Sequence, residues 1–115
     1  MLKMKKEERG GLFILTLKGN FTDDDIPEFQ KFFGEFYAVK GLKMVVDIGG
    51  LKVAGKKVWS AVAAEAKKID IAKEGIIGQT WLPILLAKIT DFFTGNKSRN
   101  FFNSVEEAEK WVRSS

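Results

Sequence analysis

Two adjacent lysines, Lys56 and Lys57, follow a loop that contains Gly49, Gly50 and Gly55. The apolar spacing after this loop predicts a helix that begins at residue 56. Free N–H groups at a helix start, flexible glycines and two ammonium groups can together hold a phosphate or an anionic headgroup. The alternative is that both lysines simply point into water. The glycine spacing matches neither a Walker loop nor a dinucleotide fingerprint, so no nucleotide is predicted.

Acidic side chains offer two further places for chemistry. Asp23, Asp24 and Asp25 are consecutive, and we place them in the first turn of a helix, where negative charge complements the helix dipole. Consecutive side chains diverge around a helix, so this spacing does not favour a metal site. Asp47 lies in an apolar run, and we expect it to accept N–H groups from the following loop. The alternative is a buried functional carboxylate.

The sequence contains no histidine and no cysteine. An imidazole general base, Ser-His and Cys-His pairs and conventional transition-metal sites are therefore excluded. Disulfides, thiolate nucleophiles and sulfur-ligated zinc or iron sites are excluded as well. We expect no enzymatic activity, no catalytic residue, and no metal or other cofactor.

The chain has ten phenylalanines, most of which we place in the core. Trp81 and Ile84 fall off the main apolar stripe of one predicted helix, and Phe33 with Tyr37 broadens the apolar face of another. These four residues form a candidate apolar patch that could accept a partner helix or an apolar ligand. The alternative is an ordinary core with isolated surface aromatics.

Length and composition indicate a single domain over residues 1–115. A chain of 115 residues with 45% hydrophobic and 30% charged residues matches an ordinary globular protein with one core. No apolar run reaches the roughly 20 residues that cross a bilayer, and the first residues do not resemble a secretory signal. We therefore expect a cytoplasmic protein that does not span a membrane. The net charge of +4 indicates solubility and does not favour nucleic-acid binding.

Periodicity and turn residues predict the element order β β α β α β α β α. The segments of the first half are strands at 1–9 and 12–18, a helix from about 22 to 41, a central strand at 44–48, a loop at 49–55 and a helix at 56–69. The segments of the second half are strands at 75–78 and 99–102 and helices at 80–95 and 104–113. Alternating strands and helices predict an α/β fold with a mixed, mostly parallel sheet of about five strands and four helices.

Local residues support the ends of these segments. The paired Gly10 and Gly11 are typical of a tight hairpin between antiparallel strands. Thr22 is the predicted N-cap of the first helix. Ser104 and Glu107 fit a capping box, in which the serine side chain reaches the Glu107 amide and the glutamate side chain reaches back.

Three strings in this order resemble the STAS domain family, and especially its SpoIIAA-like or STAS/SEC14 branch, whose best-known relatives are bacterial anti-sigma factor antagonists. The strings are GGLFILTLKGNFT at 10–22, VVDIGGL at 45–51 and RNFFNSVEEAEKWV at 99–112. The last is the most specific, because the SpoIIAA-like branch typically ends in an aromatic strand followed by a helix with Glu-Glu-Ala and Trp. The resemblance covers nearly the whole chain and implies the SpoIIAA-like fold.

The resemblance also implies a non-enzymatic regulatory domain that engages a protein partner through the loop and helix after the central strand. The family's switch is an Asp-Ser-Ser-Gly-like string with a phosphorylatable serine. Here residues 55–58 read Gly-Lys-Lys-Val at that place, so the acceptor is missing. Two alternatives stay open: a carrier or sensor of a lipophilic or anionic small ligand, and association with a membrane surface through Lys56 and Lys57. A homodimer also stays open.

Overall fold

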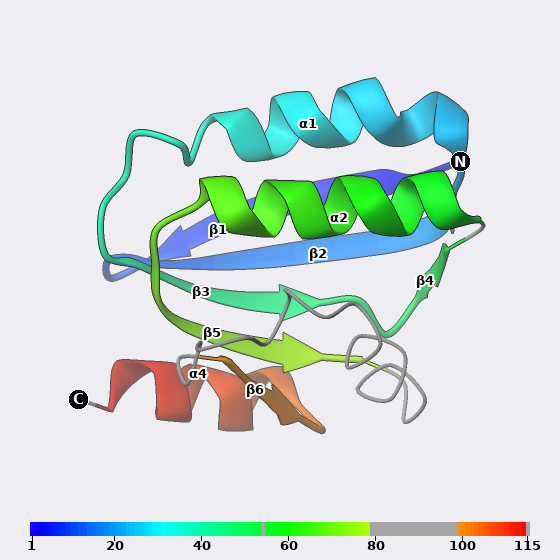
Figure 1. Cartoon of the computed structure of the whole chain (residues 1–115). Helices are drawn as coiled ribbons and strands as arrows, with labels where there is room; N and C mark the ends of the chain where they lie inside the picture. The colour runs from blue at the N-terminus through cyan, green and yellow to red at the C-terminus, as the bar shows by residue number, and fades with distance from the viewer. Residues whose placement is uncertain (54, 79–98, 115) are drawn as a thin grey trace.

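The structure, a computed structural model, describes residues 1–53, 55–78 and 99–114. Within these ranges its elements follow the predicted order with one added strand, β4 (Figure 1). They are β1 (Lys3–Arg9), β2 (Leu12–Phe21), a 3-10 turn (Asp23–Asp25), α1 (Ile26–Gly34), β3 (Leu42–Asp47), β4 (Leu51–Val53), α2 (Lys56–Lys68), β5 (Ile71–Ile77), β6 (Arg99–Phe102) and α4 (Val105–Arg113). The predicted third helix at 80–95 lies outside the described residues.

The sheet has the order β1-β2-β3-β5-β6, with β3 in the centre and the short β4 paired to β2. Among the described strands, only β1 and β2 pair antiparallel. The pairs β2 with β3, β2 with β4, β3 with β5, and β5 with β6 are parallel. Parallel neighbours require crossover connections, which α1 and α2 supply. The predicted mixed, mostly parallel sheet with a central third strand is therefore confirmed.

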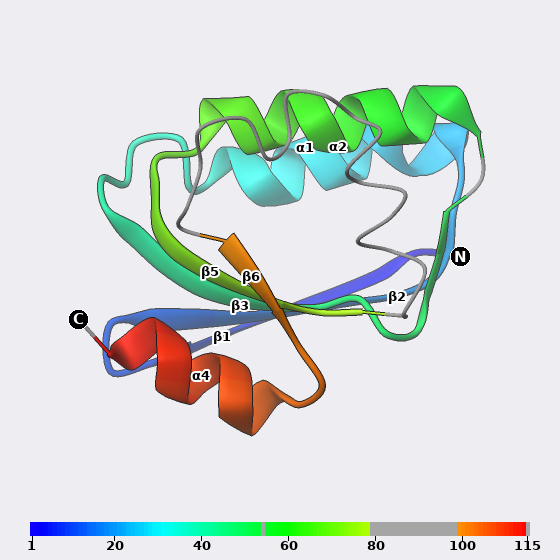
Figure 2. The same cartoon turned by 60° about the horizontal axis from the view of Figure 1, so that its bottom comes forward.

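Helices cover both faces of this sheet. Helices α1 and α2 lie side by side on one face, and α4 lies on the other face, beneath one end of the sheet (Figure 2). Successive side chains of a strand point to opposite faces, and β2 shows this alternation. Its Leu15 and Leu17 belong to the core under α1 and α2. Leu12 and Ile14 belong to the core with α4, whose Ala108 is fully buried.

The first helix is shorter than predicted. It ends at Gly34, and the chain then turns through bonds three residues apart, such as Phe36 N–H to the Phe33 carbonyl at 3.0 Å. Phe36 is nevertheless only 2% exposed. The predicted helix was too long because this buried ring, which lies in a turn, keeps the three- and four-residue spacing of the apolar residues in α1. Glycine is a weak helix former, which explains the stop at Gly34. Gly41, predicted to end the helix, instead has φ of 65° just before β3.

Two strands also differ from the prediction. The predicted loop 49–55 contains β4, because residues 51–53 pair with 19–21 of β2. Strand β5 begins at Ile71 rather than at residue 75, so it includes Lys73 and Glu74. The first half of β5 contains charged residues, so the search for apolar runs did not recognise it as part of the strand.

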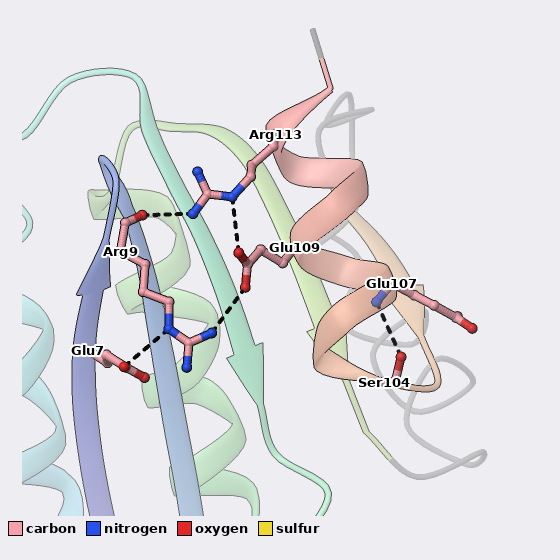
Figure 3. Close-up of polar contacts among 6 residues, drawn as sticks. All are labelled: Glu7, Arg9, Ser104, Glu107, Glu109 and Arg113. Carbon is pink, nitrogen blue, oxygen red and sulfur yellow. Dashed lines mark hydrogen bonds and ion pairs between the residues drawn. The ribbon is translucent and has the colours of Figure 1, made fainter.

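Helix α4 begins as predicted at the N-cap Ser104, whose hydroxyl accepts the Glu107 N–H at 3.2 Å. The second half of the predicted capping box is wrong, because the Glu107 side chain points away from Ser104 (Figure 3).

Charged groups join α4 to the first hairpin. Arg113 donates to the Arg9 carbonyl at 2.9 Å, and Glu109 bridges the two arginines at 3.1 and 3.4 Å (Figure 3). These groups are partly exposed, so this network positions α4 on the sheet more than it stabilises the fold.

Candidate functional site

The loop after β3 is held by hydrogen bonds. The Asp47 Oδ1 atom accepts the Gly49 N–H at 3.0 Å, as predicted for this carboxylate. The Gly19 N–H donates to the Gly50 carbonyl at 3.0 Å, and the Leu51 N–H donates to the Ile48 carbonyl at 3.1 Å. These bonds fix the path of the chain from β3 into β4.

Lys56 and Lys57 lie where the sequence predicted them, in the first turn of α2. Both side chains are exposed, and no acidic residue shares that turn. Gly55 has φ of 93°, a conformation that favours glycine, and serves as the N-cap without a side-chain bond. Two cations next to the positive end of a helix dipole are unfavourable. No acidic residue in the described part of the chain forms an ion pair with Lys56 or Lys57.

An exposed stripe runs along α2 away from the sheet. Its members are exposed and recur every three or four residues, as on one helix face: Lys56, Lys57, Ser60, Ala64, Lys67 and Lys68. We call this stripe, together with Gly49, Gly50 and Gly55, the α2 surface. It joins the candidate glycines and lysines into one continuous region.

Two of the four residues of the candidate apolar patch, Phe33 and Tyr37, lie in the described part of the chain. Phe33 is 7% exposed and packs in the core under α1, so it is not a surface residue. Tyr37 is exposed, but its hydroxyl donates to the Glu65 carboxylate. Trp81 and Ile84 lie outside the described residues.

Glu65 of α2 is a buried acid that the sequence interpretation missed. The residue is 2% exposed. Its Oε2 atom accepts the Tyr37 hydroxyl, and its Oε1 atom lies 3.6 Å from the Lys68 ammonium but has no hydrogen-bond partner in the described part of the chain. The position had a signal, since residue 65 follows the buried Val58 by seven residues and thus shares its face.

The hydrogen bond to Glu65, with smaller contributions from burial and the carboxylate charge, raises the pKa of Tyr37 from 10.0 to about 12. Tyr37 is the chain's one tyrosine, so an absorbance titration should show a single midpoint near that value. The folded protein keeps this proton longer than the unfolded chain does. Stability from this hydroxyl is thus complete below pH 10.0 and is lost as the pH rises toward about 12.

A matched variant checks the cause of the Tyr37 shift. Glu65→Gln keeps the size of the side chain but removes its charge, so the midpoint should move back toward 10.0. A native midpoint already at 10.0 would contradict the contact between Tyr37 and Glu65.

A second buried acid, Glu74 of β5, is paired with Arg99 of β6. The two residues are direct neighbours in the parallel register, and Arg99 Nε lies 2.5 Å from Glu74 Oε1. Their side chains are 10% and 5% exposed. Burial raises the pKa of Glu74, while the charge and hydrogen bond of Arg99 oppose that rise. Sequence reasoning missed this pair because the predicted strand began at residue 75 and so left Glu74 outside it.

Both buried acids border a cavity of about 90 Å³ between the sheet and helices α1 and α2. Its wall is mainly apolar and includes Phe29, Trp59, Val62 and Ala66, while Glu65, Glu74 and Arg99 supply polar atoms. An engineered apolar cavity of about 150 Å³ holds benzene. The cavity therefore suits a small, mainly apolar molecule.

Comparison with known proteins finds solved structures with a similar fold. No family model and no curated protein sequence matches the chain. An anti-sigma factor antagonist from Mycobacterium paratuberculosis is similar in structure, with a TM-score of 0.74 and 18% identity over 98% of this chain and 95% of that one. The chain has the SpoIIAA-like fold of STAS domains.

A second solved structure agrees. A DUF3478 family protein with a SpoIIAA-like fold from Shewanella loihica gives a TM-score of 0.73 and 17% identity over 96% of this chain and 93% of its own. The fold implied by the sequence resemblance is thereby confirmed. Within the SpoIIAA-like fold, residues 55–58 span the start of α2 and carry no hydroxyl group. None of the helices in the described ranges has the length and apolar character needed to cross a bilayer.

Proposed function

We propose that this chain is a non-enzymatic, STAS-like regulatory domain that binds a protein partner through the α2 surface. The observation that carries the proposal is its structural similarity, over nearly the full length of both chains, to an anti-sigma factor antagonist. The absence of histidine and cysteine from the sequence supports a role in binding rather than catalysis.

The α2 surface supports the location of this contact. Its Gly49 donates to Asp47 and its Gly50 carbonyl accepts the Gly19 N–H, so little conformational entropy is lost at these two residues on binding. Lys56 and Lys57 give it a positive end, which favours an acidic partner surface and speeds encounter with it. Because residues 55–58 lack a serine, the contact is not switched by phosphorylation there.

In-cell photocrosslinking tests this location. A photoreactive amino acid in place of Ser60, exposed on α2, should capture one protein reproducibly, whereas the same group in place of Glu106, exposed on α4, should not. Capture of the same protein from both positions would contradict the assignment. A product that contains only a second copy of this chain would show a homodimer contact instead.

The cavity supports a second candidate function, the binding of a small, mainly apolar molecule. Native mass spectrometry should then find an added mass on protein purified from its own cells that is absent after unfolding and refolding. Ala66→Phe, which fills the cavity wall, should lose that mass, while Ala64→Phe on the exposed face of α2 should keep it. Equal masses before and after refolding would contradict this second function.

A further inference from the structure

Four lysines lie together on a part of the sheet that no described helix covers. Lys3 and Lys18 are direct partners in the β1-β2 ladder, and Lys5 follows Lys3 on the same face. Lys18 shares the face of Leu12 and Ile14, which pack against α4. Lys52 lies between Leu51 and Val53, whose side chains pack against the opposite core, so it points to the same side as Lys18.

Helix α4 covers only the far end of this face. It contacts the Arg9 end of β1, about 20 Å along the strand from Lys3. In Figure 2 the N-terminus and α4 accordingly lie at opposite ends of the sheet. We call the exposed group of Lys3, Lys5, Lys18 and Lys52 the basic face.

The charges of the basic face are not compensated. None of its four ammonium groups makes an ion pair with the described residues. Two acids lie near it on this side. Asp47, partner of Thr16 beside Lys5, accepts the Gly49 N–H with its Oδ1, and Glu7, which follows Lys5 on the same face of β1, pairs with Arg9 at 3.1 Å. Like charges directly opposite in an antiparallel ladder, as at Lys3 and Lys18, destabilise the pair. Such repulsion points to an external anion.

We propose that the basic face binds a bilayer surface that carries anionic headgroups. Four cations on one face of a sheet can approach a flat target together, and clusters of four or more lysines are attracted to anionic lipids. The cations are all lysine, which is depleted at protein interfaces, whereas arginine is preferred for base and phosphate recognition. No aromatic side chain of β1, β2 or β4 lies on this face, which disfavours single-stranded nucleic acid.

This inference uses different residues from the α2 surface and does not depend on the proposed function. A domain held at a membrane by the basic face leaves α2, on the other face of the sheet, free for a protein partner (Figure 2). Failure of either binding event leaves the other testable.

Vesicle sedimentation of the full chain tests the basic face. The chain should bind vesicles of equal parts phosphatidylglycerol and phosphatidylcholine, and should not bind pure phosphatidylcholine. Binding should weaken when salt is raised to about 0.15 M, since surface charges are then screened. Lys18→Gln with Lys52→Gln should lower the partition coefficient about 30-fold. Lys31→Gln with Lys40→Gln removes the same charge from exposed sites elsewhere and should change it little.

Each other outcome overturns the proposal. No binding of the unaltered chain, or equal losses in the two double variants, would show that this face is not a membrane site. Tighter binding to duplex DNA or to polyglutamate than to the vesicles would assign the face to a different anion. Thermal unfolding of both variants verifies folding, and Lys18→Gln should melt no lower than the unaltered chain because it relieves repulsion with Lys3.

Discussion

Replacing Arg99 with methionine should lower the free energy of unfolding by about 3–5 kcal/mol at neutral pH, because it leaves the Glu74 carboxylate buried without its cation. Globular domains have only about 5–15 kcal/mol in total, so this one change removes much of the stability. Urea unfolding followed by circular dichroism measures the loss.

At lower pH the free energy of unfolding that Arg99→Met loses relative to the unaltered protein should become smaller. Burial already raises the pKa of Glu74, and removing Arg99 removes both effects that oppose the rise. The folded variant therefore holds a proton that the unfolded chain has released above the ordinary value of 4.5. Its stability is greatest below that value and falls as the pH rises through the window above it. Unfolding curves at several pH values should show the gap to the unaltered protein closing toward acid.

A double variant separates the orphaned charge from lost packing. Arg99 also makes an interaction other than its contact with Glu74, so its removal alone is not decisive. Adding Glu74→Met to Arg99→Met should restore most of the stability, since apolar replacements of a buried ion pair are often neutral or stabilising. A double variant no more stable than Arg99→Met would contradict the account of this pair.

The second large effect is expected at Gly75, where β5 packs against α4. A β-carbon built there would lie 2.8 Å from the Ala108 Cβ and 3.3 Å from its Cα. Ala108 is fully buried, so neither side can move away cheaply. Gly75→Ala should therefore lower the free energy of unfolding by about 2 kcal/mol, as overpacking of a close contact does.

The control for Gly75→Ala removes the β-carbon of Ala108, the residue on the other side of the contact. Ala108→Gly alone should destabilise α4, because glycine is the weaker helix former. In the double variant Gly75→Ala, Ala108→Gly the clash is absent, so the combined loss should be smaller than the sum of the two single losses. Strict additivity in a double-mutant cycle would show that the two residues do not meet.

Elements with strong local signals were predictable from the sequence. The Gly10-Gly11 hairpin, the apolar run of β3 and the Ser104 cap of α4 each depend on a few neighbouring residues, and all three are present in the structure. The end of α1 was not predictable in this way. Phe36 keeps the helical spacing, but it reaches the core from a turn after Gly34, and only tertiary packing decides between the two.

The candidate site was predictable in part. The start of α2 at Lys56 followed from periodicity, and the hydrogen bond of Asp47 followed from its place at a strand end. The burial of Glu65 and Glu74 could not be predicted in this way, because a charged residue is assigned to the surface unless its partner is known. Their partners Tyr37 and Arg99 are 28 and 25 residues away in sequence, and only the fold brings each pair together.

The central claim, that the α2 surface binds a protein partner, is tested most directly by calorimetric titration of the crosslinked partner in purified form. The account predicts that Lys56→Glu with Lys57→Glu weakens binding tenfold or more, about 1.4 kcal/mol, although the melting temperature does not fall, because acidic side chains are favourable in the first turn of a helix. Lys43→Glu with Lys110→Glu changes the net charge equally at exposed sites elsewhere and should leave the Kd almost unchanged. Equal affinity of both double variants and the unaltered chain would contradict the claim.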